Sequence, residues 1–472
     1  MEVRKPYIYE AILSFAFLIA VMGIGIAFFG ANPHIPMLIG TAFAAVIALK
    51  IGYKWQDIEN SMYEGIRQAL QAIIILAIIG VLIGVWLLSG VVPTMIYFGL
   101  KILSPKIFLV ATVLICSITS LATGTSWGTA GTIGIALMGI ASGLGVPAPI
   151  AAGAVISGAY FGDKMSPLSD TTNLAPAMAG TDVFTHVKFM LKPTLIAYVI
   201  TLAVFAFVGL DFGGNNVDMT AIQTMKTALE TSFNLSPILL LPPITVIVLI
   251  SRKVPAIPGI FIGIILGAVL APIFQGANFG DILNSGYSGF VSHTGIESID
   301  SLLTAGGLSN MMYSISLTLI AMMFGGIMER TGQLEVIVAK LLGLVHSATG
   351  LITLTIATCI GSNMTMPEQY ISIVVPGRMY AQAYRDRGLH PKTLSNALES
   401  AGTLTSALIP WNTCGAFLYG VLGVPTMLYA KWAVFNYVTP IVVILLSFTG
   451  LTVAMLTDEE QKANSESVEV EA

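Results

Sequence analysis

Long apolar runs recur along the whole sequence, and they constrain the fold more than any other feature. A bilayer core about 30 Å thick is crossed by roughly 20 helical residues. Ten runs come near or exceed that length: 10–29, 35–51, 68–89, 148–181, 192–210, 235–250, 256–274, 310–328, 391–424 and 432–456. Only 10% of the residues are charged and 55% are hydrophobic, whereas a soluble domain is nearer a quarter charged. The sequence therefore predicts an all-α polytopic membrane protein.

Two further apolar stretches, 106–142 and 349–379, are interrupted near their middle. The interruptions read "ATGTSWGTAGT" and "IGSNMTMPEQ". Non-helical backbone inside a membrane occurs only where protein or a water-filled cavity meets its unpaired amides and carbonyls. We expect a re-entrant hairpin at each interruption. Two ordinary spans joined by a polar turn are the alternative.

One decapeptide occurs twice. "DIENSMYEGI" (57–66) and "DILNSGYSGF" (281–290) share Asp, Ile, Asn, Ser, Tyr and Gly at the same places. We interpret this as an internal duplication in which each copy is an amphipathic connector. Each half has five predicted spans, an odd number, so the second half enters the membrane in the opposite direction. The predicted fold is two inverted repeats of five transmembrane helices plus one re-entrant hairpin each, the usual build of secondary transporters.

The distribution of basic residues tests this topology. With a cytoplasmic N-terminus, sixteen Lys and Arg residues fall inside, four fall outside, and Lys164 remains in the membrane. This matches the excess of positive charge found in cytoplasmic loops. We predict a first repeat over 1–210, an external linker over 211–234, a second repeat over 235–456, and a disordered acidic cytoplasmic tail over 457–472. Both termini are expected in the cytoplasm.

Composition excludes several other classes of function. A net charge of -4 without a basic block gives no footprint for nucleic acid. Cys116, Cys359 and Cys414 lie in apolar runs without a CxxC spacing, so neither a zinc site nor a disulfide framework is suggested. The expected partners are membrane lipid and small transported solutes, and no cofactor is expected.

The chemistry concentrates in the first broken helix, 148–181. Asp163, Lys164 and Asp170 lie where hydrocarbon is expected, and such charges are costly unless they are paired, hydrated or neutralised. Pro167 should unwind the helix between them. The oxygen and amide groups nearby belong to Ser166, Ser169, Thr171, Thr172 and Asn173. Because hard cations prefer oxygen ligands, we predict a Na⁺ site at Asp170 with Ser169, Thr172 and Asn173. The alternative is a structural role, with a salt bridge of Lys164 to one carboxylate and hydroxyls that cap the helix.

The second half repeats this arrangement without aspartates. Pro410 is expected to break the helix over 391–424. The predicted ligands there and at the hairpin tips are Thr125, Ser126, Ser362, Asn363, Thr403, Thr405, Asn412 and Thr413. Glu399 and Glu368 are secondary candidates. Helix capping is an equally good interpretation of Glu368, because it follows Pro367 at the start of a half-helix.

Two motifs carry a family resemblance. At "GTSWGT" (124–129) and "GDKMSPLSDTTNLAP" (162–176) the chain resembles the NhaC family of bacterial sodium/proton antiporters, which includes malate/lactate exchangers and relatives thought to carry amino acids. The resemblance implies membership of the wider ion transporter superfamily. It also implies a scaffold and a transport domain that move in elevator fashion, commonly in dimers, within the bacterial inner membrane.

Three other functions compete with sodium/proton exchange. "GTSWG" fits the G-x-S-x-G pattern of a hydrolase, but that elbow requires a strand-turn-helix and a histidine base. All five histidines fall in predicted loops or span ends, and we interpret His186 as a solvated loop residue. An open channel would need a continuous polar face. We predict a secondary active sodium/proton antiporter that works by alternating access, and not an enzyme. Sodium- or proton-coupled exchange of a small organic acid or amino acid is the alternative.

Overall fold

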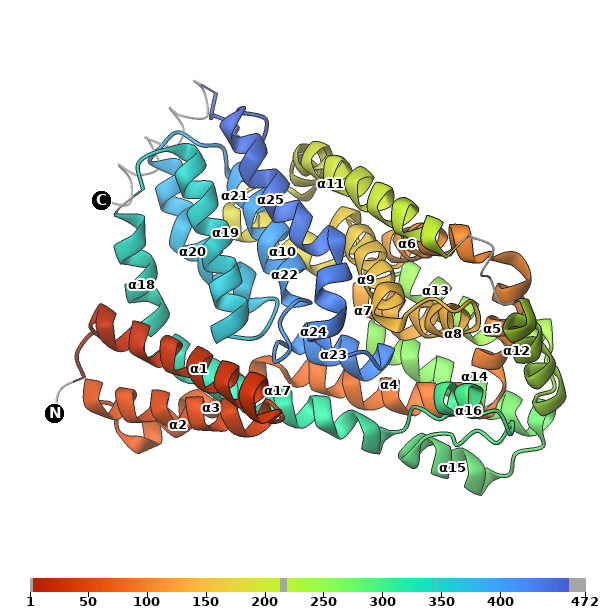
Figure 1. Cartoon of the computed structure of the whole chain (residues 1–472). Coiled ribbons are helices and arrows are strands. Elements are labelled where there is room, and N and C mark those ends of the chain that lie inside the picture. The colour runs from red at the N-terminus through yellow and green to blue at the C-terminus, as the bar shows by residue number, and fades with distance from the viewer. Residues whose placement is uncertain (1–2, 213–218, 344, 458–472) are drawn as a thin grey trace.

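The computed structural model describes residues 3–212, 219–343 and 345–457, and helices make up almost all of this part of the chain (Figure 1). Within it there is no β-strand, only two isolated bridges, Phe290 with Ala305 and Leu389 with Met455. Apolar sequence inside a membrane must satisfy its backbone hydrogen bonds within each segment, which helices do. The predicted tail lies outside the described residues, except for Thr457.

The first half of the chain contains helices α1 to α11. In order, they are α1 (Ile8–Phe29), α2 (His34–Ile51), α3 (Trp55–Gln68), α4 (Leu70–Leu88), α5 (Val91–Ile102), α6 (Pro105–Thr123), α7 (Ser126–Thr129), the π-helix η1 (Ala130–Gly134), α8 (Ile135–Gly143), α9 (Ala148–Met165), α10 (Asp170–Ala179) and α11 (Val183–Asp211).

The second half contains the remaining helices. They are α12 (Met219–Ser232), η2 (Pro237–Leu240), α13 (Leu241–Ser251), α14 (Ala256–Gln275), α15 (Phe279–Ser288), α16 (Glu297–Leu303), α17 (Leu308–Arg330), α18 (Gln333–Leu342), α19 (Ala348–Thr365), α20 (Ile371–Arg385), α21 (Pro391–Leu398), the π-helix η3 (Glu399–Thr403), α22 (Leu404–Ser406), α23 (Thr413–Leu422), α24 (Thr426–Tyr429), η4 (Ala430–Trp432) and α25 (Val434–Phe448).

Seven of the described helices are long and apolar enough to cross a membrane: α1, α2, α4, α6, α11, α14 and α17. Two bent pairs, α12 with η2–α13 and α23 with α24–η4, raise the number to nine. The chain is a multi-pass membrane protein. Six of the seven belong to the ten runs in the sequence, and α6 belongs to the interrupted stretch 106–142. The runs 148–181 and 391–424 are each divided by a break. In the runs 235–250 and 432–456, α13 and α25 have only 11 and 15 residues.

The chain interrupts its helices at the four predicted places. Helix α6 ends at Thr123, with Gly124 as its C-cap, and α7 begins at Ser126. Helix α9 ends at Met165 and α10 begins at Asp170, after Pro167. In the second half, residues 366–370 separate α19 from α20, and residues 407–412 separate α22 from α23. Proline explains three of these breaks, since it removes a backbone donor and clashes with the preceding turn.

The order of elements and their packing recur between the two halves. Helix α2 packs against α17 while α4 packs against α14, and α3 packs against α17 while α15 packs against α4. Suppose that α2 corresponds to α14, α3 to α15 and α4 to α17. The contact of α2 with α17 then corresponds to that of α14 with α4, and the contact of α3 with α17 corresponds to that of α15 with α4. Figure 1 shows the N-terminal helices α1 and α2 lying beside α17 and α18 of the second half.

The duplicated decapeptide forms α3 and α15, and it makes the same contact in both halves. A Cβ added at Gly326 of α17 would lie 2.1 Å from the Ser61 carbonyl oxygen, and one added at Gly84 of α4 would lie 2.1 Å from the Ser285 carbonyl oxygen. Ser61 and Ser285 occupy the same position of the decapeptide. In each copy, the backbone of the decapeptide helix therefore packs directly against a glycine of a long helix.

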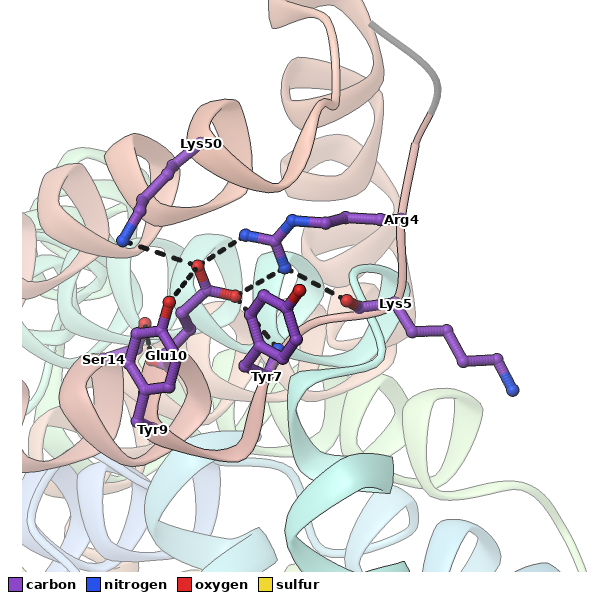
Figure 2. Close-up of polar contacts among 7 residues, drawn as sticks. All are labelled: Arg4, Lys5, Tyr7, Tyr9, Glu10, Ser14 and Lys50. Atoms are coloured by element: carbon purple, nitrogen blue, oxygen red, sulfur yellow. Dashed lines mark hydrogen bonds and ion pairs between the residues drawn. The ribbon is translucent and has the colours of Figure 1, made fainter.

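The start of α1 is fixed by one buried carboxylate (Figure 2). Glu10 is 0% exposed, and its two oxygens accept hydrogen bonds from the Arg4 guanidinium at 2.6 and 2.8 Å. The Lys50 ammonium lies 3.5 Å from Glu10 Oε1, which joins α2 to this cluster. Because removing one partner of a buried charge leaves the other uncompensated, these groups hold α1 against α2.

Two segments are more ordered than the sequence analysis expects. The segment 211–234 was expected to be a linker, but its described part contains α12, whose Ile222, Met225 and Leu229 are buried. That spacing is typical of an amphipathic helix. Residues 91–102, for which the sequence predicts no span, form the helix α5, most of which is buried. Both helices are shorter than a full span, so a search for span-length apolar runs does not find them.

Candidate functional site

One cavity is lined by three of the four breaks, two from the first half and one from the second. Its volume is ≈ 530 Å³. It is lined by the α3–α4 junction, the α6–α7 and α9–α10 breaks, the α13–α14 loop and the α19–α20 break. The predicted ligands that line it are Thr125, Ser126, Asp163, Ser169, Asp170, Thr171, Asn173 and Glu368. Three carboxyl groups therefore face one cavity.

Asp163 is one of the two buried carboxyl groups that line this cavity. It lies in the last turn of α9 and is 5% exposed. Its Oδ2 accepts hydrogen bonds from the Ser126 backbone N–H at 3.1 Å and from the Ser126 hydroxyl at 2.6 Å. Ser126 is placed there because the chain restarts at α7, whose N-cap Thr125 accepts a hydrogen bond from the Gly128 N–H. The first interruption and the first broken helix thus meet at this carboxylate.

Asp170 and Glu368 sit differently in the same cavity. Asp170 is the first residue of α10 and is exposed, and its Oδ2 accepts a hydrogen bond from the Tyr370 hydroxyl at 3.5 Å. Glu368 is buried, and its Oε2 accepts hydrogen bonds from the backbone N–H groups of Tyr370 at 2.6 Å and Ile371 at 3.1 Å. The capping interpretation of Glu368 therefore fits its contacts, since these donors have no partner within α20.

Side chains around Pro167 satisfy the backbone carbonyls that the break exposes. Thr172 Oγ1 donates to the carbonyl oxygens of Asp163 and Lys164 at 3.1 and 3.0 Å. Asn173 Nδ2 donates to the carbonyl oxygens of Pro167 and Ser169 at 2.8 and 2.6 Å, and Ser166 Oγ donates to that of Leu121 at 2.8 Å. Because buried carbonyls require partners, these three side chains first of all maintain the break.

Lys164 points away from the cavity. It is 0% exposed, and its Nζ donates to the Ser400 hydroxyl of η3 at 3.0 Å. None of the ion pairs in the described part of the chain involves Lys164. The salt-bridge part of the alternative, between Lys164 and Asp163 or Asp170, is therefore wrong. Its helix-capping part is confirmed at Ser169, whose hydroxyl accepts a hydrogen bond from the Thr172 N–H at 3.4 Å. Beside Lys164, Glu399 Oε1 accepts a hydrogen bond from the Thr171 hydroxyl at 3.2 Å, so both halves meet here as well.

The predicted ligands of the second half form a support behind the cavity. Asn363 Nδ2 donates to the Gly402 carbonyl oxygen at 2.8 Å and to the Thr405 hydroxyl at 3.0 Å, and Asn412 Nδ2 donates to Asn363 Oδ1 at 3.1 Å. These bonds tie the α19–α20 break to η3, α22 and the start of α23. The predicted ligands of the second half that are buried but do not line the cavity are Ser362, Asn363, Thr403, Thr405, Asn412 and Thr413.

Comparison with known proteins identifies the family. The model of the Na⁺/H⁺ antiporter family matches residues 158–451, more than half of the chain. The Na⁺/H⁺ antiporter NhaC of Alkalihalophilus pseudofirmus is 42% identical over 426 residues, which covers 89% of this chain and 91% of that protein. The chain belongs to the NhaC family of Na⁺/H⁺ antiporters. This is a family of transporters and not a class of enzymes.

Other relatives of this NhaC-family chain are named for organic solutes. The malate-2H⁺/Na⁺-lactate antiporter of Bacillus subtilis is 38% identical over 449 residues, covering 95% of this chain and 96% of that protein. The arginine/ornithine antiporter ArcD of Halobacterium salinarum is 36% identical over 465 residues, covering 98% of this chain and 96% of that protein.

The family supports Na⁺ and H⁺ as the transported ions. In the described part of the chain, no group of three or more His, Cys, Asp or Glu side chains could hold a resident metal ion.

Several cavity residues of this family member escaped the sequence analysis. They are Gln68, Gln71, Trp127, Lys253, Gln369 and Tyr370. Trp127, Gln369 and Tyr370 lie within or beside the two interrupted motifs, so their positions carried a signal. Trp127 also stacks on Phe417 of α23 with ring centroids 4.2 Å apart. Gln68, Gln71 and Lys253 come from neighbouring segments, and only tertiary packing brings them to the cavity.

The interpretation of His186 as a solvated loop residue is wrong. His186 lies in the first turn of α11, is 0% exposed, and its Nδ1 lies 2.8 Å from the Ser395 hydroxyl. The Ser395 hydroxyl also donates to the Lys392 carbonyl oxygen at 3.1 Å, so this serine links the start of α11 to α21. Helix α11 starts nine residues before the predicted span at 192, and α21 covers its first turn.

Proposed function

We propose that this protein exchanges Na⁺ for H⁺ across the bacterial inner membrane. The observation that carries the proposal is Asp163, a carboxyl group 5% exposed in a cavity that also holds Asp170. An isolated charge in such surroundings is costly, and either a proton or a bound cation removes the cost. A proton and a sodium ion therefore compete for Asp163, and this competition couples their movements.

The ligands that we propose for sodium surround the α9–α10 break. Asp163 and Asp170 supply carboxylate oxygens, and Ser126, Ser169 and Thr171 supply hydroxyls. Such hard oxygen donors suit a hard cation. Asp170, Ser169 and Asn173 of the set predicted from sequence remain in this proposal. Thr172 is left out, because it lies outside the cavity lining.

Alternating access would follow from the duplicated architecture. Reciprocal packing of α2 with α17 and of α4 with α14 supports two repeats related by a pseudo-two-fold axis. We propose that this axis lies in the membrane plane, that the interrupted segments are re-entrant hairpins, and that the transport domain moves as an elevator within a homodimer. Gln68 and Lys253 line the cavity and belong to segments with the basic residues expected inside. The cavity would then face the cytoplasm, where both termini also lie.

Coupled exchange of an organic solute is the second candidate. A volume of ≈ 530 Å³ exceeds what a single ion needs and falls in the range of small-molecule pockets. The names of the malate/lactate and arginine/ornithine relatives point the same way. Lys164 was the residue expected to attract an anion, and it does not line the cavity. Lys253 does line the cavity, but it stands against the carboxyl groups of Asp163, Asp170 and Glu368, and this acidic excess favours the inorganic cation over an organic acid.

Everted membrane vesicles with a pH-sensitive dye test the proposal. Respiration acidifies the lumen, and the proposal expects proton efflux when sodium alone is added to the outside. Malate, lactate and arginine are added separately, with and without sodium. Efflux that requires one of these solutes would overturn sodium/proton antiport in favour of the second candidate.

Variants of cavity residues test whether sodium-driven proton efflux depends on the cavity. Asp163→Asn and Asp170→Asn should each abolish or strongly reduce sodium-driven efflux at unchanged expression and size-exclusion behaviour. Ser104→Ala, at an exposed position outside the cavity, is the control and should match the wild type. Wild-type turnover in Asp163→Asn would remove that residue from the proposed site.

A further inference from the structure

Lys253 has a backbone conformation that residues with a side chain rarely adopt. Its φ is 65°, and it is the one non-glycine residue with positive φ in the described part of the chain. It terminates α13, where its N–H donates to the Ile250 carbonyl oxygen at 2.8 Å and the Val254 N–H donates to that of Leu249 at 3.1 Å. This is a Schellman-type helix end, which normally uses glycine at this position.

The first half of the chain uses glycine at the corresponding helix end. Gly30 terminates α1 with φ 59°, and the Ala31 N–H donates back to the Gly25 carbonyl oxygen at 2.9 Å. The turn leads into "PHIP" (33–36), as the turn after Lys253 leads into "PAIP" (255–258). The two turns thus share their role and their following motif. Glycine adopts the positive φ of this turn without strain in the first half. We therefore look for a role of the lysine side chain that explains why lysine occupies this position in the second half.

The location of Lys253 supplies that reason. Lys253 lines the cavity that contains Asp163, Asp170 and Glu368, whereas Gly30 does not. The side chain is exposed, and no carboxylate of the described residues lies within 4.0 Å of its ammonium group. A basic residue needed only for membrane topology could occupy the neighbouring position, and Arg252 already does so without a positive φ. The charge of Lys253 is therefore placed at the cavity itself.

We propose that Lys253 determines ion affinity and selectivity: its tethered positive charge at the cavity opposes the binding of cations, and it opposes divalent cations more than monovalent ones. The inference rests on the proposed sodium site. The carboxyl groups that line the cavity attract a divalent cation more strongly than Na⁺, because the attraction scales with the charge of the ion, although among the described residues they are not grouped closely enough to hold a resident metal ion. The repulsion from Lys253 scales in the same way and offsets this preference.

Lys253→Gly gives the sharpest test, because glycine suits the backbone better than lysine does. The Tm should stay unchanged or rise. The sodium concentration for half-maximal proton efflux should fall about threefold. The concentration of Mg²⁺ or Ca²⁺ that half-inhibits efflux should fall about tenfold. The repulsion energy doubles for a divalent ion, so the factor by which its affinity changes is the square of the factor for sodium. Both shifts should shrink when ionic strength is raised with choline chloride.

Two further variants separate charge from structure. Lys253→Arg keeps the charge and should stay close to wild type in both concentrations. Arg252→Gln removes a neighbouring charge that does not line the cavity, and its shifts should be clearly smaller than those of Lys253→Gly. If wild type shows sodium-driven efflux and Lys253→Gly leaves both concentrations unchanged, the inference is overturned while the proposed function stands. If wild type shows no such efflux, the proposed function fails and takes the inference with it.

Discussion

Asp163 and Asp170 are seven positions apart, and the break between them gives them unlike surroundings. Asp163 ends one helix and is buried against Ser126, while Asp170 begins the next helix and is exposed beside Tyr370. An unbroken helix would have placed both on one face about two turns apart. The break instead lets a buried and an exposed carboxyl group share one cavity, which suits a site that an ion must enter and leave.

Ser126→Ala should weaken sodium binding without unfolding the protein. The hydroxyl donates to Asp163 Oδ2 at 2.6 Å, and the backbone N–H of the same residue would remain as a second donor. Losing a hydrogen bond to a charged group should raise the half-maximal sodium concentration by about tenfold, or ~1.4 kcal/mol. Titrating sodium in the vesicle assay measures this shift, with Ser104→Ala as control. An unchanged midpoint would separate Ser126 from the ion site.

The contacts of the duplicated helices predict matched stability effects. Gly84→Ala and Gly326→Ala would each place a Cβ 2.1 Å from a carbonyl oxygen, of Ser285 and Ser61 respectively. The helices would have to separate, at a cost of about 1–3 kcal/mol. Both variants should therefore lower the Tm in detergent. In α1, Gly23 has no atom within 4 Å of an added Cβ, so Gly23→Ala is the control and should not lower it. Equal Tm values for all three variants would contradict the proposed packing role.

The loop before α16 should loosen in acid. The Thr294 N–H is the main group that lowers the pKa of Asp300 to about 2, from an ordinary value of 3.8, with help from Ser292 and Gly295. A carboxyl group whose pKa is lowered by folding stabilises the fold above its unfolded pKa, and this contribution disappears as the pH falls through the folded pKa. The loop should become cleavable by pepsin between about pH 4 and pH 2. Asp300→Ala should be cleaved across the whole window, and equal cleavage of wild type and variant at pH 4 would count against this role.

At the scale of elements, sequence and structure agree where proline or a full-length apolar run gives the signal. The breaks after Asp163, before Glu368 and near Pro410 were placed correctly, because proline interrupts a helix whatever surrounds it. Helices α5 and α12 were missed, because neither reaches the length of a span. In α12 the buried spacing of Ile222, Met225 and Leu229 was present in the sequence, but it was outweighed by the polar residues around it.

The site was only partly predictable, because its residues come from both halves. Asp163, Ser126 and Asp170 were found from their types and motifs, and they do line the cavity. The direction in which Lys164 points depends on Ser400, 236 positions away. No local pattern reports such a pairing. The same reason explains why His186 was misjudged and why Lys253 was overlooked.

At the scale of the whole molecule, the two decapeptides should face opposite sides of the membrane. Tyr63 and Tyr287 occupy the same position of the repeat and are 58% and 64% exposed. Cysteine replacing Tyr63 should react with an impermeant maleimide only from the cytoplasmic side, and cysteine replacing Tyr287 only from the outside. The three native cysteines are buried, so background labelling should be low. Labelling of both positions from the same side would contradict the inverted repeat.

Competition between sodium and a proton at Asp163 is the central claim for the whole molecule, and proton release tests it most directly. Sodium chloride is added to purified protein in weakly buffered solution, and the pH is followed against choline chloride at equal ionic strength. The account predicts a saturable release of protons in wild type and none in Asp163→Asn. Sodium binding without proton release, or equal release from the variant, would contradict it.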